Sequence, residues 1–187
     1  MFLIPQDYEA IIRTEILTTI TAGKNYNVEA AELTARAEME SYLASRYDVA
    51  KILVDVAPWT NGPQFDTGAL VWATGALGTQ LVFTATAPSA GINPFDPGTG
   101  WIPKDPRNQL IRTYLTDMAV YHAHAAIPHK AIPELRVMRY EAAINWLDKV
   151  NKGQLTPALP LLPDTADGTP TDGVIRLGSN PKVRHDR

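Results

Sequence analysis

The segments Asn108–Ala126 (NQLIRTYLTDMAVYHAHAA) and Pro133–Gly153 (PELRVMRYEAAINWLDKVNKG) decide the fold of this chain. The first repeats apolar and aromatic residues at intervals of three and four, which align on one face of a helix. Its stripe is Ile111, Tyr114, Leu115, Met118, Tyr121, His122 and Ala125. The second opens with Pro-Glu and ends at Gly, as a helix start and stop should. Its stripe is Tyr140, Ala143, Trp146, Leu147 and Val150. The two segments therefore predict a helical pair.

Two further helical segments lie near the start of the chain. Val28–Tyr47 (VEAAELTARAEMESYLASRY) predicts one long helix, and a shorter one begins at Pro5, breaks near Arg13 and resumes as Thr14–Thr21. The main stripe of the long helix is Val28, Ala31, Ala35, Met39, Tyr42 and Leu43. The residues expected to pack the core are Met39, Tyr42, Leu43, Tyr114, Met118, Tyr140, Trp146 and Leu147. We predict a mainly α protein with a small four-helix core.

Some apolar residues lie off the main stripes. On the long N-terminal helix they are Ala30, Leu33, Ala37 and Ala44, and on the last helix Met138, Ala142 and Ile144. A helix that is apolar on several sides needs more than one neighbour. A single small copy can hardly supply them all, so the pattern favours self-association.

The segment between the helical pairs, residues 57–107, has a different character. It is rich in Gly, Pro, Thr and aromatic residues and contains few charges. Ala69–Ala73 and Leu81–Thr86 predict two strands joined by a turn at Gly75–Gly78. The expected domains are thus a helical core (1–56 and 108–153), an inserted β-rich module (57–107) and an extended C-terminal arm (154–187).

Composition narrows the classes of function. The chain has no cysteine, which excludes disulfides, thiolate catalysis and cysteine-bearing zinc sites. The first residues lack the basic start of a signal peptide, and no run approaches the length of a membrane span. Net charge is −3, but residues 174–187 carry Arg176, Lys182, Arg184 and Arg187 against Asp186 alone, which gives +3 there and −6 elsewhere.

No constellation of residues predicts an enzyme, a metal site or a cofactor. His122 and His124 are two residues apart and point to opposite sides of a helix, so we expect one packed histidine and two at the surface, with His129 in the turn. Glu29, Glu32, Glu38 and Glu40 are interpreted as a solvated face. The Asp-rich run from Asp164 to Gly173 lacks the spacing of a calcium loop.

Two surfaces are candidates for binding. Trp59, Trp72 and Trp101 could stack on sugar rings or on a protein if exposed, although burial in a small module is the favoured interpretation. In the C-terminal arm, Val174, Ile175 and Leu177 could add a strand to a neighbour, and the basic residues Arg176, Lys182, Arg184 and Arg187 could pair with its acidic body or with a phosphate backbone.

Three segments together resemble the head–tail connector, adaptor or head-completion proteins of tailed phages, of the phage Mu-like group. They are Ile4–Tyr8, Ala37–Tyr47 (AEMESYLASRY) and Arg139–Gly153 (RYEAAINWLDKVNKG), and their order and ends carry the match. In addition, the inserted segment resembles small chitin-binding-type carbohydrate-binding modules. That second likeness rests on Phe65, Gly68, Val71, Trp72, Thr84, Ala85, Gly91, Pro94 and Trp101.

The resemblance implies a non-enzymatic structural protein of the virion. Such a subunit would join a ring, commonly of twelve copies, beneath the portal, and would connect capsid to tail around a channel through which double-stranded DNA passes. Its partners would be its own copies, the portal protein and the next tail or ring protein, with no membrane. The protein would assemble in the bacterial cytoplasm. The alternatives are a glycan-binding or protein-binding module on a helical base, and a small regulatory protein that binds nucleic acid through the basic tail.

Overall fold

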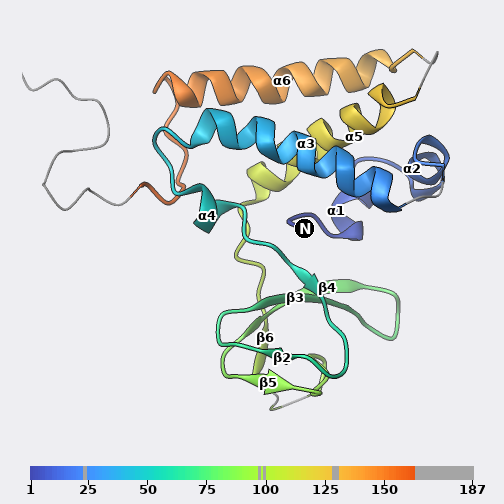
Figure 1. Cartoon of the computed structure of the whole chain (residues 1–187), viewed down its shortest axis with the longest axis vertical. Helices are drawn as coiled ribbons and strands as arrows, with labels where there is room; N and C mark the ends of the chain where they lie inside the picture. Colours follow the sequence, from blue (N-terminus) through green and yellow to red (C-terminus); the bar gives the residue numbers. More distant parts are fainter. Residues whose placement is uncertain (23–24, 97, 99, 128–130, 163–187) are drawn as a thin grey trace, which may run out of the picture.

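The computed structural model of the chain describes residues 1–22, 25–96, 98, 100–127 and 131–162. The helices gather at one end of the molecule and the strands at the other, and two stretches of chain connect them (Figure 1).

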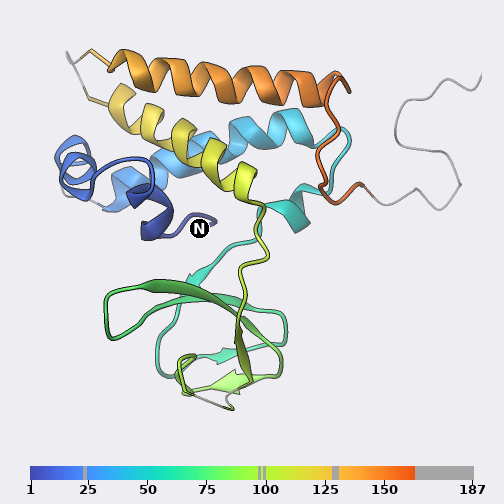
Figure 2. The same ribbon diagram turned by 180° about the vertical axis from the view of Figure 1, so that it is seen from behind.

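Three long helices form the main core. They are α3 (Asn25–Leu43), α5 (Gln109–Ala125) and α6 (Glu134–Asn151), and each of them contacts the other two. The view from behind shows α5 crossing α3, with α6 alongside both (Figure 2). Asn108 fixes the start of α5, because its side chain accepts hydrogen bonds from the backbone N–H groups of Leu110 and Ile111. Fully buried side chains at the centre include Met39, Leu43, Ile111, Leu115, Met118 and Leu147.

The N-terminal segment covers the remaining side of α5. The predicted break is confirmed: α1 (Pro5–Glu9) and α2 (Thr14–Ile20) are separated by an extended Arg13. Both short helices contact α5. As a result, just over half of the residues of α5 are buried, whereas α3 and α6 each keep one face exposed. A fourth short segment, α4 (Val49–Ile52), is capped by the side chain of Asp48.

The strands form a small mixed sheet. Its order is β1 (Ala57–Pro58), β3 (Leu70–Thr74), β4 (Gln80–Ala85) and β6 (Trp101–Pro103), with β1 parallel to β3 and the other pairs antiparallel. A separate antiparallel pair joins β2 (Gln64–Phe65) to β5 (Ser89–Ala90). The two predicted strands and the turn between them are therefore confirmed. One face of the sheet packs Val71, Ala73, Phe83, Ala85 and Trp101 together. The other face packs Leu70 and Val82 against Ile4 and Val56.

The interpretation as a mainly α protein with a four-helix core is wrong. In the described residues, six helices share the fold with a four-stranded mixed sheet and a two-stranded pair. Only three of the helices are long, because the first helical segment splits into two short pieces. Strands of two or three residues, several with proline, are too short to produce the alternating pattern from which strands are predicted.

The start of the predicted arm folds back on its own chain. The N–H of Asp48 donates to the carbonyl of Pro160 at 2.9 Å, and the N–H of Leu162 donates to the carbonyl of Arg46 at 3.1 Å. Between them, Tyr47 and Leu161 form an antiparallel bridge. Residues 154–162 therefore form a strap across the helical part. Residues 163–187, including every predicted contact from Val174 to Arg187, lie outside the described residues.

Candidate functional site: the helix–sheet junction and the exposed helix faces

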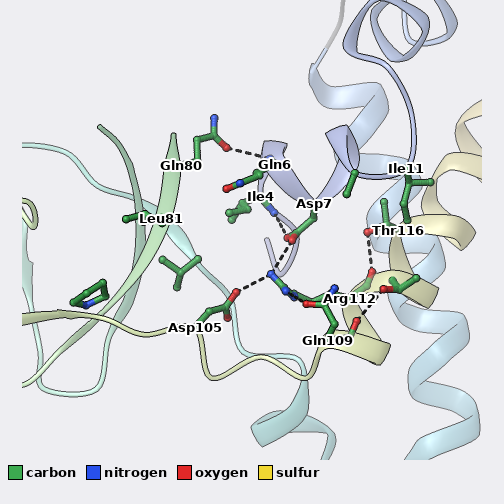
Figure 3. Close-up of a pocket in the computed structure, with 14 residues that line it drawn as sticks. Ile4, Gln6, Asp7, Ile11, Gln80, Leu81, Asp105, Gln109, Arg112 and Thr116 are labelled. Carbon is green, nitrogen blue, oxygen red and sulfur yellow. Dashed lines mark hydrogen bonds and ion pairs between the residues drawn. The ribbon is translucent and has the colours of Figure 1, made fainter. Parts of the chain in front are cut away.

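A cleft of about 410 Å³ lies where the helices meet the sheet (Figure 3). Asp7 comes from α1, Gln80 and Leu81 from β4, and Arg112 from α5. Gln80 also accepts a hydrogen bond from the backbone N–H of Gln6, which ties the sheet to α1 directly. None of the residues that line this cleft was predicted from the sequence to belong to a site.

Arg107 is the centre of the charge network beside the cleft. Its side chain is 1% exposed, and its Nη1 atom donates to the carbonyl of Phe2 and, at 2.8 Å, to Asp7 Oδ2. Its Nε and Nη2 atoms donate to the two carboxylate oxygens of Asp105 at 2.9 and 2.8 Å. A two-pronged contact of this kind fixes the angle between the guanidinium and carboxylate planes.

Arg112 completes the network from α5. Its Nη1 atom lies 3.1 Å from Asp7 Oδ1 and 2.8 Å from Asp105 Oδ2. Two arginines thus balance two aspartates. Burial alone would raise the pKa of Asp105, but the hydrogen bonds and positive charge of Arg107, with the charge of Arg112, lower that pKa on balance. The network joins the N-terminal segment, the stretch after β6 and the start of α5, so we interpret it as a clamp that sets the sheet against the helices.

A buried glutamate anchors the N-terminal segment from the other side. Glu32 on α3 is 2% exposed, and one carboxylate oxygen accepts the N–H groups of Phe2 and Leu3 at 2.8 and 3.1 Å. The other oxygen accepts the Tyr8 hydroxyl at 3.2 Å. Burial raises the pKa of Glu32, although these hydrogen bonds oppose the shift. The prediction that Glu32 belongs to a solvated face is therefore wrong.

The other acidic residues of α3 differ from one another. Glu29 is exposed, whereas Glu38 is half-buried, accepts the Tyr140 hydroxyl at 2.6 Å and lies 3.1 Å from His122 Nε2. Glu40 pairs with Arg36 at 3.0 Å. His124 is buried, so both histidines of α5 are packed, while His129 and His185 lie outside the described residues. Among the described residues, no three His, Cys, Asp or Glu side chains are grouped to hold a metal ion.

The three predicted tryptophans do not form one surface. Trp101 is buried and packs edge-on against Phe65, with ring centroids 5.5 Å apart. Trp59 and Trp72 are half-buried and share a groove of about 320 Å³ with Pro58, Ala73, Thr74 and Asn93. The backbone N–H of Trp59 donates to the carbonyl of Trp72, which holds the two residues side by side.

The predicted packing residues lie in the helical core. Met39, Leu43, Met118 and Leu147 are fully buried. The aromatic residues of the predicted set are half-buried and pack against that core; they are Tyr42, Tyr114, Tyr140 and Trp146.

Two helix faces remain uncovered in the single copy. The α3 face consists of Ala30, Leu33, Ala37, Ser41 and Ala44, all exposed, with Leu33 61% exposed. The α6 face consists of Leu135, Met138, Ala142 and Asn145, with Leu135 56% and Met138 58% exposed. The second apolar row predicted on α3 therefore has no cover within the single copy.

Comparison with known proteins adds one finding. A family model described as "Bacteriophage Mu, Gp36" matches residues 101–175, which is less than half of the chain. This match supports a bacteriophage protein. The matched range contains β6, α5 and α6 and continues beyond the described residues. Of the three segments that carried the phage resemblance, only Arg139–Gly153 lies inside it.

No curated protein and no solved structure matches the chain. Within the described residues, no helix combines the length and apolar character that a membrane crossing requires.

Proposed function

We propose that this chain is a structural subunit of the phage virion, a head–tail connector or adaptor that forms a ring beneath the portal. In this proposal the ring joins capsid to tail, encloses the channel for DNA and has no enzymatic activity of its own. The partners are further copies of the chain, the portal protein and the next protein of the tail.

The observation that carries the proposal is the pair of uncovered apolar helix faces. Leu33, Leu135 and Met138 are each more than half exposed on helices that are otherwise packed into a core. Contiguous apolar surface of this kind is typical of protein interfaces. The range that matches the phage family contains α6 with one of these faces. This match supports an interface within a phage particle.

Charge is consistent with a channel role. The chain carries −6 outside residues 174–187, so its body repels the phosphate backbone and leaves DNA free to move. The basic residues Arg176, Lys182, Arg184 and Arg187 would then tie one copy to the acidic body of the next, with Val174, Ile175 and Leu177 adding apolar contacts.

The first test is the mass of the purified full chain. Mass photometry over a range of concentrations should show closed rings, either alone or after addition of the portal protein, and negative-stain images should show a central channel. A chain that stays monomeric at high concentration and does not bind the portal would overturn the proposal.

A second candidate function is a binding module for a glycan or a protein. The groove between Trp59 and Trp72 favours it, because two half-exposed aromatic rings without a neighbouring charge suit a sugar face. Trp59→Ala and Trp72→Ala should each abolish glycan-array binding while the circular dichroism spectrum stays unchanged. Trp101→Ala is unsuitable, because Trp101 is buried and its loss would unfold the module. Equal binding by wild type and both variants would remove this candidate.

A further inference from the structure

The three long helices occupy the corners of a triangle, and each corner is covered differently. Helix α5 is covered by α1 and α2, whereas α3 and α6 have no such cover. Since α3 and α6 pack against each other and against α5, their exposed faces point in different directions. A two-fold dimer through the α3 face would leave the α6 face in water, and the converse also holds.

The directions of the two helices suit a side-by-side contact between copies. Both views show α3 and α6 running the same way, while α5 runs against them (Figures 1 and 2). Rotation about an axis parallel to these helices preserves their direction. Helix α6 of one copy would therefore meet α3 of the next copy in parallel.

The side chains of the two faces are complementary in size. Met138 and Ala142 lie one helical turn apart on α6, which leaves a space at the level between them. Leu33 fits that space, because its flanking residues Ala30 and Ala37 are small. The mostly small residues of the α3 face let a neighbouring helix approach closely, and the larger residues of the α6 face fill the gap.

The charges beside the two faces are complementary in the same register. With Leu33 placed between Met138 and Ala142, a rise of about 1.5 Å per residue sets Glu40 within one turn of Lys149 and Glu29 within one turn of Arg139. Glu29, Arg139 and Lys149 are exposed. Of the four glutamates of α3, Glu29 and Glu40 lie beside this face, whereas Glu32 is buried and Glu38 contacts Tyr140.

We propose that the α3 face of one copy docks on the α6 face of the next copy, head to tail, with Leu33 seated between Met138 and Ala142. This inference rests on the proposed ring and names the surfaces that build it. When two different faces meet, each copy still has a free face, so further copies can be added, and the assembly closes into a ring if the rotation between neighbouring copies divides a full turn. When two copies of the same face meet, no such face is left and the assembly stops at a dimer.

Disulfide trapping tests the contact directly, because the chain has no cysteine of its own. Leu33→Cys and Ala142→Cys are prepared as separate full-length proteins and oxidised alone and mixed. We expect cross-linked dimers only in the mixture, and a ladder of larger species from the doubly substituted chain. Thr60→Cys, an exposed position on the β module, replaces either partner as the matched control and should give no dimer.

The outcomes separate this inference from the proposed ring. If the wild-type chain forms rings but the mixture gives no dimer, the α3–α6 contact is wrong and the ring stands. Dimers from either single variant alone would indicate that two α3 faces or two α6 faces pair with each other. This result would also overturn the α3–α6 contact. A wild-type chain that never assembles would remove both proposals.

Charge reversal provides a second readout that does not depend on cysteine chemistry. Glu40→Lys should weaken assembly about three- to tenfold, because it places a like charge opposite Lys149 and also breaks the Arg36–Glu40 pair. Adding Lys149→Glu should restore most of the loss. If the double variant assembles no better than Glu40→Lys alone, the two residues do not meet.

Discussion

At the scale of single residues, Glu32 is a carboxyl group buried in an apolar core, compensated by hydrogen bonds and by the positive charge of the N-terminal amine. Its oxygens accept three donors from the N-terminal segment, while burial penalises the ionised form and raises its pKa. A carboxyl group whose pKa is higher in the folded chain gives its full stabilisation below the pKa of the unfolded chain and loses it as pH rises.

Glu32→Gln should therefore make the free energy of unfolding less dependent on pH. The amide oxygen can still accept the two backbone N–H groups, and the amide nitrogen can donate to the Tyr8 hydroxyl. We expect wild type to lose stability relative to this variant as pH rises from about 4.5 through the raised pKa of Glu32. Urea unfolding at intervals between pH 4 and 8 measures the difference. A difference that is constant across that range would contradict the assignment.

Arg107 is the second residue on which the fold depends. It joins Phe2, Asp7 and Asp105 from a side chain that is almost fully buried. Arg107→Ala should cost about 3–5 kcal/mol of unfolding free energy, because it leaves two carboxylates partly buried without their main partner. Chemical denaturation measures the loss. Lys152→Ala, which removes an exposed pair with Asp148, is the control and should cost less than about 1 kcal/mol. Similar losses in the two variants would show that the clamp contributes little.

At the scale of elements, the end of α6 shows how local chemistry and packing meet at one glycine. Gly153 has φ +71°, and the N–H groups of Gly153 and Gln154 donate to the carbonyls of Val150 and Lys149. These two hydrogen bonds form the Schellman motif, in which a glycine ends a helix. A Cβ atom at this position would lie 2.5 Å from Nη1 of Arg46, which is the far end of a flexible side chain and can shift at little cost.

Gly153→Ala should cost about the backbone penalty alone. The positive φ costs a side chain about 1–2 kcal/mol, and the end of the Arg46 side chain can move aside at little cost. Gly78→Ala, with φ +78° and no atom within 4 Å of the added Cβ, isolates the backbone term. Thermal unfolding should therefore give the two variants similar melting temperatures. A clearly lower melting temperature for the Gly153 variant would mean that Arg46 cannot move aside freely.

At the scale of the whole molecule, the strap formed by residues 154–162 ties α4 and the end of α3 to the chain after α6. Its two backbone hydrogen bonds are long-range, because Arg46 and Asp48 pair with residues more than a hundred positions later. A chain ending at residue 162 keeps the strap and serves as the reference. A chain ending at residue 153 should melt several degrees lower, because each hydrogen bond contributes about 0.5–1.5 kcal/mol. Circular dichroism on heating measures both. Melting of the two truncated chains at one temperature would show that the strap is not part of the fold.

Whether a helix face is covered also depends on the packing of the whole molecule. The off-stripe residues of α3 and α6 predicted a second neighbour for each helix, and the structure leaves Leu33, Leu135 and Met138 in solvent. In the proposed ring, this neighbour is another copy of the chain.

The sequence by itself determined the long helices, the break at Arg13, the hairpin of β3 and β4 and the stop at Gly153, because each depends on periodicity or on turn chemistry within a few residues. It predicted the exposed row of Ala30, Leu33, Ala37 and Ala44 on α3 for the same reason, but on α6 it missed Leu135 and included Ile144, which packs against the core. Only the tertiary structure decided the short strands, the buried Glu32 and the clamp around Arg107. Asp7 and Arg107 are separated by 100 positions, and Phe2 and Glu32 by 30. Their contacts follow from how the helices and the sheet pack, and no pattern of neighbouring residues records that packing.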